Sequence, residues 1–406
     1  MRVLAVLIRT NADHEIGGSE RSFVELGNHL VEQGMEVDVL EVAPPLSSRM
    51  ASMLNHYVVD ASGKLPFRFL RHTLCALRIA RSRGCGVIFA PAVYWPETVF
   101  VALMASVATG KPLFIGIPGP FQEEEDRMSF FEVVMLRLNG QRAYKTMFAT
   151  FLRKIALRSA DGLLFATGEM AEDYKHRYGL KNAVAIGRGV DDLWYRAEDL
   201  PAAKDYDAIY VGRLDRGKGV ETLIRAWASV GASIPGSRLL IVGAGSRAGE
   251  YRRLAEECKV GGLVRFEGFV KSPLEVRRRL RSSKLFVLPS EEEGFARAVS
   301  EAMASGTPCV VSDIPAMREL YGGAAVLVPP GDPAKLAESL VSLLLDEDAR
   351  SDLSRLGVAR AKRFTWKETA DLTRRAFERA SVSDPGERTP STATPEVRRE
   401  ATAGLG

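Results

Sequence analysis

The sequence predicts an α/β protein built from two doubly wound, Rossmann-like domains. At 406 residues the chain is longer than one hydrophobic core usually supports, so two domains are expected. Short apolar runs of strand length alternate with segments of helical periodicity, and glycines stand at several strand-to-helix turns. This alternation is typical of βαβ units, whose strands lie parallel in one sheet.

The composition is that of an ordinary globular protein, with 46% hydrophobic and 26% charged residues. The net charge of +4 is small for this length and neither demands nor excludes a nucleic-acid or membrane partner; we expect no nucleic acid. The four cysteines form no C-x-x-C pair and have no histidine at metal spacing, so we expect no metal and a reduced, cytoplasmic compartment. The apolar start is too short for a signal peptide, and no transmembrane stretch is expected.

The first domain is predicted to span residues 1–197. The expected elements are a strand over 3–8, a helix that ends at Gly34, and strands over 37–40, 86–90, 112–116 and 161–166. Gly17 and Gly18 lie at the first strand-to-helix turn, where they let a ligand approach the backbone, and the helix that follows favours negative charge. They are therefore candidate substrate-binding residues, although a tight turn alone would also explain them.

Two segments of the first domain, 67–83 and 129–158, mix large apolar residues with basic ones. Surface helices of this kind can lie on anionic lipid, which would give peripheral contact with the inner face of a membrane. The alternative is that the apolar residues face the core and the basic residues face water. Between these segments, the acidic run 123–126 is either part of an acceptor site or a solvated loop.

The polar stretch 198–205 is the expected linker, and the second domain is predicted over 206–365. Its first strand runs into Gly212–Lys218, which fits G-x-x-x-x-G-K and is nearly a P-loop. A Walker A motif needs Ser or Thr next to hold Mg²⁺, and Gly219 stands there. The glycine turn after the strand at 239–242 is not G-x-G-x-x-G, so a nicotinamide site is unsupported.

The most informative stretch is 285–308. A strand at 285–288 is stopped by Pro289, and an acidic loop leads to a helical segment that opens at Gly294-Phe295 and closes at Gly306. Glu293 and Glu301 are separated by eight positions, one before the helix and one inside it. The amides that follow Gly294 point outward from the helix N-terminus, where an anion or a sugar hydroxyl can bind them.

The stretch E-G-F-x-x-x-x-x-E-A-M-A-x-G-x-P resembles the E-x7-E signature of the retaining GT-B glycosyltransferases of family 4. A plain strand–loop–helix with solvated carboxylates is the alternative, but it does not explain why glutamates, glycines and proline fall in place together. Gly212–Gly219 is similar to the family's G-R-x-x-x-x-K-G, and the block after Gly17 is similar to its opening motif. The resemblance covers the chain up to residue 380.

The resemblance implies a hexosyltransferase-type enzyme that moves a sugar from a nucleotide diphosphate sugar to an acceptor hydroxyl on a glycan, glycolipid or small molecule. The donor expected is a UDP-sugar rather than a GDP-sugar, used without a metal. The implied catalytic residues are Glu293, which would hold the donor sugar, and Arg213 and Lys218, which would hold its diphosphate.

The resemblance also implies a set of substrate-binding groups. Glu301 would accept hydrogen bonds from the ribose. The backbone after Gly294 would hold sugar hydroxyls and phosphate through the amides of Phe295, Ala296 and Arg297. Ala296 stands where glycine is common in the family, and the loop at Gly17 and Gly18 would approach the donor phosphate or the acceptor.

Three further features concern the acceptor side and the chain end. The loop after the strand at 112–116 lacks the histidine found in many family members, and His14 is the nearest alternative. Arg188 replaces the usual asparagine of the family's N-G-V-D segment. A helix over 366–380 should cross back to the first domain, and residues 381–406, rich in Pro, Ser, Thr and Gly, should be disordered.

Other functions stay open on the sequence alone. A GT-B nucleotide-sugar epimerase would use the same donor site without an acceptor, and a non-catalytic nucleotide-sugar-binding protein would keep the site without turnover. A P-loop phosphohydrolase is a more distant reading. A glycosidase uses two carboxyls that flank the bond, but that reading leaves Arg213 and Lys218 unexplained.

Overall fold

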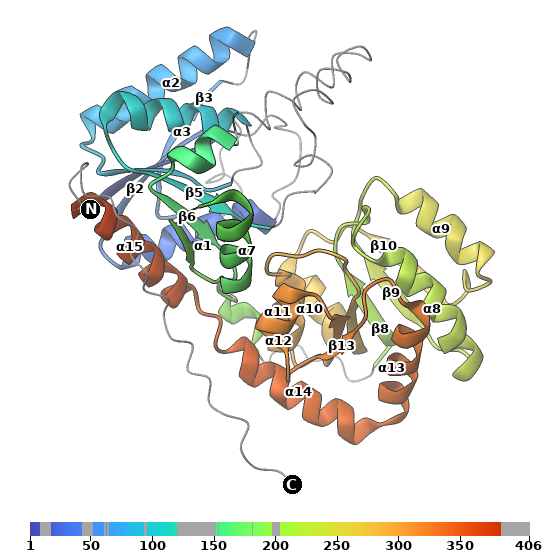
Figure 1. The fold of residues 1–406 in the computed structure, drawn as a ribbon. Helices are drawn as coiled ribbons and strands as arrows, with labels where there is room; N and C mark the ends of the chain where they lie inside the picture. Colours follow the sequence, from blue (N-terminus) through green and yellow to red (C-terminus); the bar gives the residue numbers. More distant parts are fainter. Residues whose placement is uncertain are drawn as a thin grey trace.

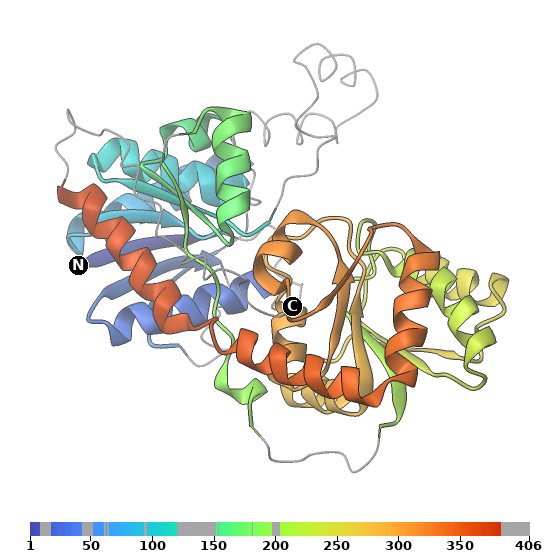
Figure 2. The same ribbon diagram turned by 60° about the horizontal axis from the view of Figure 1, so that its bottom comes forward.

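The computed structural model describes residues 1–8, 18–42, 52–60, 62, 65–92, 96–119, 152, 154–180, 182–196 and 204–382. It confirms the predicted α/β class, since two parallel sheets are each flanked by helices in separate lobes (Figures 1 and 2). The acidic run 123–126, His14, Gly17 and most of the segment 129–158 lie outside the described residues.

The first sheet has the strand order β3-β2-β1-β4-β5-β6-β7, and every pairing is parallel. Its strands are β1 (Arg2–Leu7), β2 (Glu36–Val42), β3 (Asn55–Val59), β4 (Val87–Ala90), β5 (Leu113–Ile117), β6 (Gly162–Phe165) and β7 (Ala183–Ala185). The sequence predicted neither β3 nor β7. Both are edge strands, which lack the continuous apolar run that marks a strand buried on both faces.

Side chains along β1 alternate between the two faces of the first sheet, and helices cover both faces. The helices are α1 (Gly18–Glu32), α2 (Leu65–Ser82), α3 (Pro96–Thr109) and α7 (Gly168–Tyr178), followed by the 3₁₀ turn η3 (Asp192–Trp194). Leu4 and Val6 belong to the cluster that includes residues of α2 and α3. Val3 and Leu7 belong to the cluster that includes residues of α1 and of the last helix of the chain.

The second sheet has the order β10-β9-β8-β11-β12-β13, again parallel throughout. Its strands are β8 (Tyr206–Val211), β9 (Leu239–Val242), β10 (Val264–Gly268), β11 (Ser283–Leu288), β12 (Cys309–Ser312) and β13 (Val326–Val328). Its helices are α8 (Val220–Ser233), α9 (Ala248–Glu257), α10 (Pro273–Arg281), α11 (Arg297–Ala304), α12 (Pro315–Tyr321), α13 (Pro333–Leu345) and α14 (Glu347–Ala361).

The last helix, α15 (Trp366–Val382), lies on the first sheet rather than on the second (Figure 2). Phe377 of this helix packs its ring against Phe89 and Phe114, at centroid distances of 5.5 and 4.7 Å. The helix runs two residues past the expected end at residue 380. The chain after Val382 lies outside the described residues.

Both sheets share one topological feature that locates a binding site. The strand order reverses beside the first strand of each, between β1 and β4 and between β8 and β11. In open α/β sheets, ligands bind in the crevice outside the carboxyl ends of the strands at such a switch point. The loops that follow β8 and β11 carry nearly all the site residues predicted for the second domain.

Candidate active site

The loop after β8 is tied directly to the loop after β11. The amide of Glu291 donates to the carbonyl of Gly217 over 2.8 Å. Gly219 has φ +68°, and a Cβ on it would lie 1.8 Å from the carbonyl oxygen of Pro289. Only glycine fits this close approach, so the Ser or Thr of a Walker A motif could not stand at this position. The geometry therefore argues against a P-loop.

This contact between the loops brings two of the predicted catalytic residues together. Nζ of Lys218 lies 2.7 Å from Oε1 of Glu293, and Ser290 donates its hydroxyl to the same oxygen over 3.0 Å. The two charged side chains are 20% and 14% exposed. The pair thus stands half-shielded at the switch point of the second sheet, with the lysine held in place by the carboxylate.

Arg213, the other predicted cation, shares the loop with Lys218 but not its contacts. Its side chain is 75% exposed, and its nearest recorded ion-pair partner is Asp215, at 3.4 Å. Its backbone is better fixed, because Tyr210 donates its buried hydroxyl to the Arg213 carbonyl over 2.8 Å. Burial raises the pKa of Tyr210, so this hydroxyl stays protonated and able to donate.

The helix of the E-x7-E stretch begins later than expected. α11 starts at Arg297, and Ala296 precedes it in the left-handed conformation, with φ 50° and ψ 64°. The ring of Phe295 is buried against Tyr321 and Phe364, so this side chain anchors the loop and does not line the site. Tyr321 donates its hydroxyl to the Phe295 carbonyl over 2.5 Å, which holds the strained turn in place.

Arg297 joins Glu301, the second carboxylate of the E-x7-E stretch, to the first lobe. Its Nη2 donates to Oε1 of Glu301 over 3.0 Å and lies 3.9 Å from Oδ2 of Asp191. Asp191 accepts a further hydrogen bond of 2.6 Å from the indole of Trp366, at the start of α15. We predicted a role for the Arg297 amide but not for its side chain. The position of Asp191 in the segment similar to N-G-V-D was the available signal.

Three carboxylates gather around this arginine: Glu25 of α1, Asp191 and Glu301. Burial raises the pKa of Glu301, Asp191 raises it further, and Arg297 opposes the shift. The pKa of Glu25 is raised by burial as well, and next by Asp191. A buried carboxylate that keeps one positive neighbour can accept hydrogen bonds from vicinal hydroxyls such as those of a ribose.

The loop after β11 touches the first lobe at Gly294. A Cβ on this residue would lie 2.4 Å from the carbonyl oxygen of Pro118 and 2.7 Å from Cα of Gly119. The contact falls on the loop after β5, where many family members carry a histidine. Gly294 therefore serves a second purpose, since it permits the donor loop to approach the first lobe.

A second contact between the lobes lies at the start of α7. Glu319 of α12 accepts hydrogen bonds from the amides of Gly168 and Glu169, at 2.8 and 2.7 Å. A carboxylate at a helix N-terminus is favoured by the free amides and by the helix dipole. Nothing in the sequence pairs Glu319 with a helix about 150 residues earlier.

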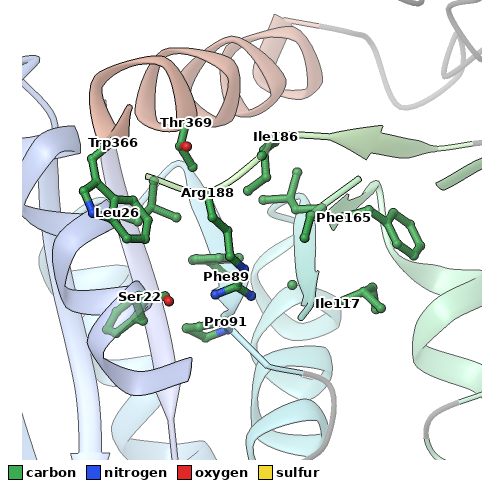
Figure 3. A pocket seen from close by; sticks show the side chains of 15 residues that line it. Ser22, Leu26, Phe89, Pro91, Ile117, Phe165, Ile186, Arg188, Trp366 and Thr369 are labelled. Carbon is green, nitrogen blue, oxygen red and sulfur yellow. The ribbon is translucent and has the colours of Figure 1, made fainter. Parts of the chain in front are cut away.

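A pocket opens at the carboxyl ends of β4, β5, β6 and β7 in the first lobe (Figure 3). The side chain of Arg188 projects into it, among Ser22, Phe89 and Pro91. The other residues that line it are Phe23, Leu26, Gly116, Ile117, Leu164, Phe165, Ala166, Ile186, Gly187, Trp366 and Thr369. Gly18 begins α1, whose residues Ser22, Phe23 and Leu26 line this pocket, whereas Gly17 lies outside the described residues.

The described residues offer neither a metal-binding cluster nor a membrane-spanning helix. Among them, no group of three or more His, Cys, Asp or Glu side chains is placed to hold a metal ion. No helix in the described part of the chain combines the length and apolar character needed to cross a bilayer.

Each half of the chain matches a known protein family. Residues 16–192 match the family described as Glycosyltransferase Family 4, and residues 195–359 match the family described as Glycosyl transferases group 1. The boundary between the two matched segments falls between residues 192 and 195.

Several curated proteins are similar in sequence. A glycogen synthase of Mycobacterium tuberculosis (strain CDC 1551 / Oshkosh) is 30% identical over 247 residues, which is 59% of this chain and 59% of that protein. A phosphatidyl-myo-inositol mannosyltransferase of Mycobacterium leprae (strain TN) is 34% identical over 182 residues, 43% of this chain and 47% of the other. A D-inositol 3-phosphate glycosyltransferase of Corynebacterium jeikeium is 31% identical over 192 residues, 45% of this chain and 46% of that protein. The chain thus spans about half the length of the curated relatives it matches.

Solved structures share the fold over nearly the whole chain. A glycosyltransferase from Rickettsia africae has a TM-score of 0.71 at 15% identity, covering 94% of this chain and 99% of that one. Anabaena HepE, solved in complex with UDP, has a TM-score of 0.70 at 17% identity, covering 94% of this chain and 100% of its own. At such identities the likeness concerns the fold, which is two facing lobes of the GT-B type.

Proposed function

Because the chain belongs to the family 4 glycosyltransferases of GT-B fold, we propose that it transfers a sugar from a nucleotide diphosphate sugar to an acceptor hydroxyl with retention at the anomeric carbon. The observation that carries this proposal is the pair of Lys218 and Glu293, 2.7 Å apart at the switch point of the second sheet. The cation suits the diphosphate and the carboxylate suits the sugar, which lie on either side of the bond that breaks.

In the proposed mechanism, Lys218 binds the diphosphate and stabilises the charge that develops on the leaving nucleotide. Arg213 reaches the same phosphates from its exposed position on the loop. The diphosphate competes with Glu293 for the lysine ammonium, so the carboxylate is freed to hold the hydroxyls of the donor sugar. Positive side chains at the phosphates replace the metal ion that many other transferases use.

The second carboxylate is assigned to the ribose. Glu301 accepts hydrogen bonds from the ribose hydroxyls, while Arg297 keeps the carboxylate in place. The backbone from Gly294 to Arg297 lies at the N-terminus of α11, which favours the phosphate and sugar oxygens. The donor proposed is a UDP-sugar, and the UDP complex of Anabaena HepE supports this choice of base.

We further propose that the protein is cytoplasmic and makes peripheral contact with the inner face of a membrane through α2. Phe67, Leu70 and Leu74 are 72%, 58% and 56% exposed, at spacings that place them on one face of this helix. Arg71 and Arg78 flank them along the same groove. An apolar stripe with basic neighbours suits an anionic lipid surface. Flotation with vesicles that contain phosphatidylglycerol would test it, with phosphatidylcholine vesicles as the comparison.

The decisive experiment for the activity combines binding and turnover. A thermal-shift screen against UDP, GDP, ADP and their sugars, with and without EDTA, should raise Tm with UDP in both conditions. Incubation of the UDP- and GDP-sugars with pooled lipid and sugar acceptors should then yield a glycosylated product. Isomerised donor without acceptor would favour an epimerase, and binding without either reaction would favour a non-catalytic binding protein.

A further inference from the structure

Arg188 occupies a position that the proposed function does not use. It is the one charged residue among the described residues that line the first-lobe pocket, and the remainder of the lining is largely apolar. Figure 3 shows its guanidinium reaching between Ser22 and Ile117 toward Pro91. We propose that Arg188 binds an anionic group, a phosphate or a carboxylate, on the acceptor, and so sets acceptor specificity. This inference rests on the proposed glycosyltransferase function.

The backbone around Arg188 is fixed on both sides, so the direction of its side chain is set by the fold. The amide of Ile186 donates to the Phe165 carbonyl over 2.9 Å, and the amide of Val190 donates to the Phe364 carbonyl over 3.0 Å. A Cβ on Gly189 would lie 2.3 Å from the ring of Trp366. The chain is therefore clamped between β6 and the start of α15, with Arg188 projecting from the clamped segment.

The chemistry of the pocket suits an anion. The planar guanidinium presents paired N–H donors that match the oxygens of a phosphate or a carboxylate. Such a hydrogen bond is strengthened where apolar side chains exclude water, and Phe89, Ile117 and Phe165 do so here.

The pocket adjoins the donor site. Ile117 lines the pocket and precedes Pro118, whose carbonyl lies against Gly294 of the donor loop. Asp191 follows Arg188 in the same segment and faces Arg297, which binds the proposed ribose carboxylate Glu301. An anion held by Arg188 would thus place the rest of the acceptor next to the loop that presents the donor sugar.

The test uses Arg188→Asn and Arg188→Lys in the full chain. Arg177→Asn is the control, because that arginine lies on α7 with 48% of its side chain exposed and pairs with Asp173. Initial rates are measured with acceptors matched in pairs, a sugar and its phosphate monoester or its uronic acid, at saturating UDP-sugar. Loss of one charge-assisted contact should raise KM for the anionic acceptors on the order of 10- to 100-fold in Arg188→Asn.

The same variant should leave KM for neutral acceptors and for UDP-glucose within about twofold, and Arg188→Lys should recover part of the loss. A second donor arm compares UDP-glucose with UDP-glucuronate. If Arg188→Asn raises KM only for UDP-glucuronate, the arginine binds the donor sugar and the proposal is wrong. Equal loss with charged and neutral acceptors would overturn it as well.

A binding measurement separates this inference from the activity. Calorimetric titration with glucose 6-phosphate and with inorganic phosphate should detect binding to the unaltered protein that Arg188→Asn loses, with UDP binding unchanged. If UDP binds and sugar is transferred but no preference for anionic acceptors exists, only the inference about Arg188 fails. If no sugar nucleotide binds but phosphate does and depends on Arg188, the proposed function fails while the anion site stands.

Discussion

The pair of Lys218 and Glu293 gives the sharpest prediction for the donor site. Removing the lysine by Lys218→Met takes away the cation proposed to bind the diphosphate. Removing the charge of its partner by Glu293→Gln leaves the lysine in place without its carboxylate. Lys218→Met should therefore weaken nucleotide binding whereas Glu293→Gln should not, although both lower turnover.

The magnitude follows from the geometry of the contact. A hydrogen bond that involves charged groups contributes about 1.5–3 kcal/mol, and the side chains here, 20% and 14% exposed, are partly shielded from water. Because 1.4 kcal/mol corresponds to roughly a tenfold change, Lys218→Met should weaken UDP binding roughly 10- to 100-fold. In Glu293→Gln the diphosphate no longer competes with a carboxylate, so UDP affinity should be unchanged or higher.

Turnover should fall in both variants. Loss of a group that stabilises charge in the transition state typically costs about 3 kcal/mol, so kcat should fall on the order of 100-fold in either variant. The assay is calorimetric titration with UDP beside initial rates at saturating acceptor, and Lys335→Met, which removes an exposed lysine paired with Glu338 on α13, is the control.

A double-mutant cycle completes the test, since residues in contact should couple by more than about 0.5 kcal/mol in the free energy of UDP binding. The reasoning is refuted if Glu293→Gln weakens UDP binding as much as Lys218→Met does. It is also refuted if the two changes are additive, or if neither lowers turnover.

Three further predictions concern neighbouring groups. Glu301→Gln should weaken UDP binding and flatten its pH dependence. Because burial raises the pKa of Glu301, the UDP affinity of the unaltered protein should fall as acidification protonates this carboxylate. A variant whose pH profile runs parallel to that of the unaltered protein would exclude Glu301 as the ribose ligand. Ala296→Gly should raise the free energy of unfolding by about 0.5 kcal/mol in urea titrations, because relief of a left-handed alanine outweighs the added freedom of the unfolded chain. A fall of more than ~1 kcal/mol in the free energy of unfolding would show that the turn is not strained. Glu319→Ala should raise the donor KM roughly two- to fivefold, since an exposed carboxylate at a helix N-terminus contributes about 0.3–1 kcal/mol. The variant should also have a larger radius of gyration in small-angle scattering. An unchanged radius of gyration would show that Glu319 does not help to close the lobes.

The residues of the proposed donor site could be singled out in the sequence because they are close together along the chain. Glu293 and Glu301 lie on one strand–loop–helix unit, and the glycines around them are dictated by local geometry. The central strands were equally readable, since burial on both faces requires continuous apolar runs. The start of α11 was misplaced because the left-handed conformation of Ala296 leaves no mark in a pattern of apolar spacing.

The contacts between the lobes could not be predicted for a physical reason. Arg297 meets Asp191, and Glu319 meets the start of α7, only after both sheets have formed and packed. Neither partner is marked by periodicity, because an exposed or half-buried charge looks the same in sequence whether it pairs across a cleft or faces water. Phe295 was predicted to bind substrate through its amide, and nothing in the sequence indicated that its ring would pack against Tyr321 and Phe364.

The unequal placement of Lys218 and Arg213 sets an order of events for the donor. The lysine is already held at the site by Glu293, whereas the guanidinium of Arg213 is 75% exposed beside Asp215. A diphosphate that binds Lys218 first would displace Glu293 toward the sugar and present its second phosphate to Arg213. On this proposal the arginine would close over the donor last, and its contact would form only with substrate. An arginine held this way contributes little to the stability of the free protein, so Arg213→Ala should leave Tm unchanged while lowering kcat/KM, whereas Lys218→Met should alter both.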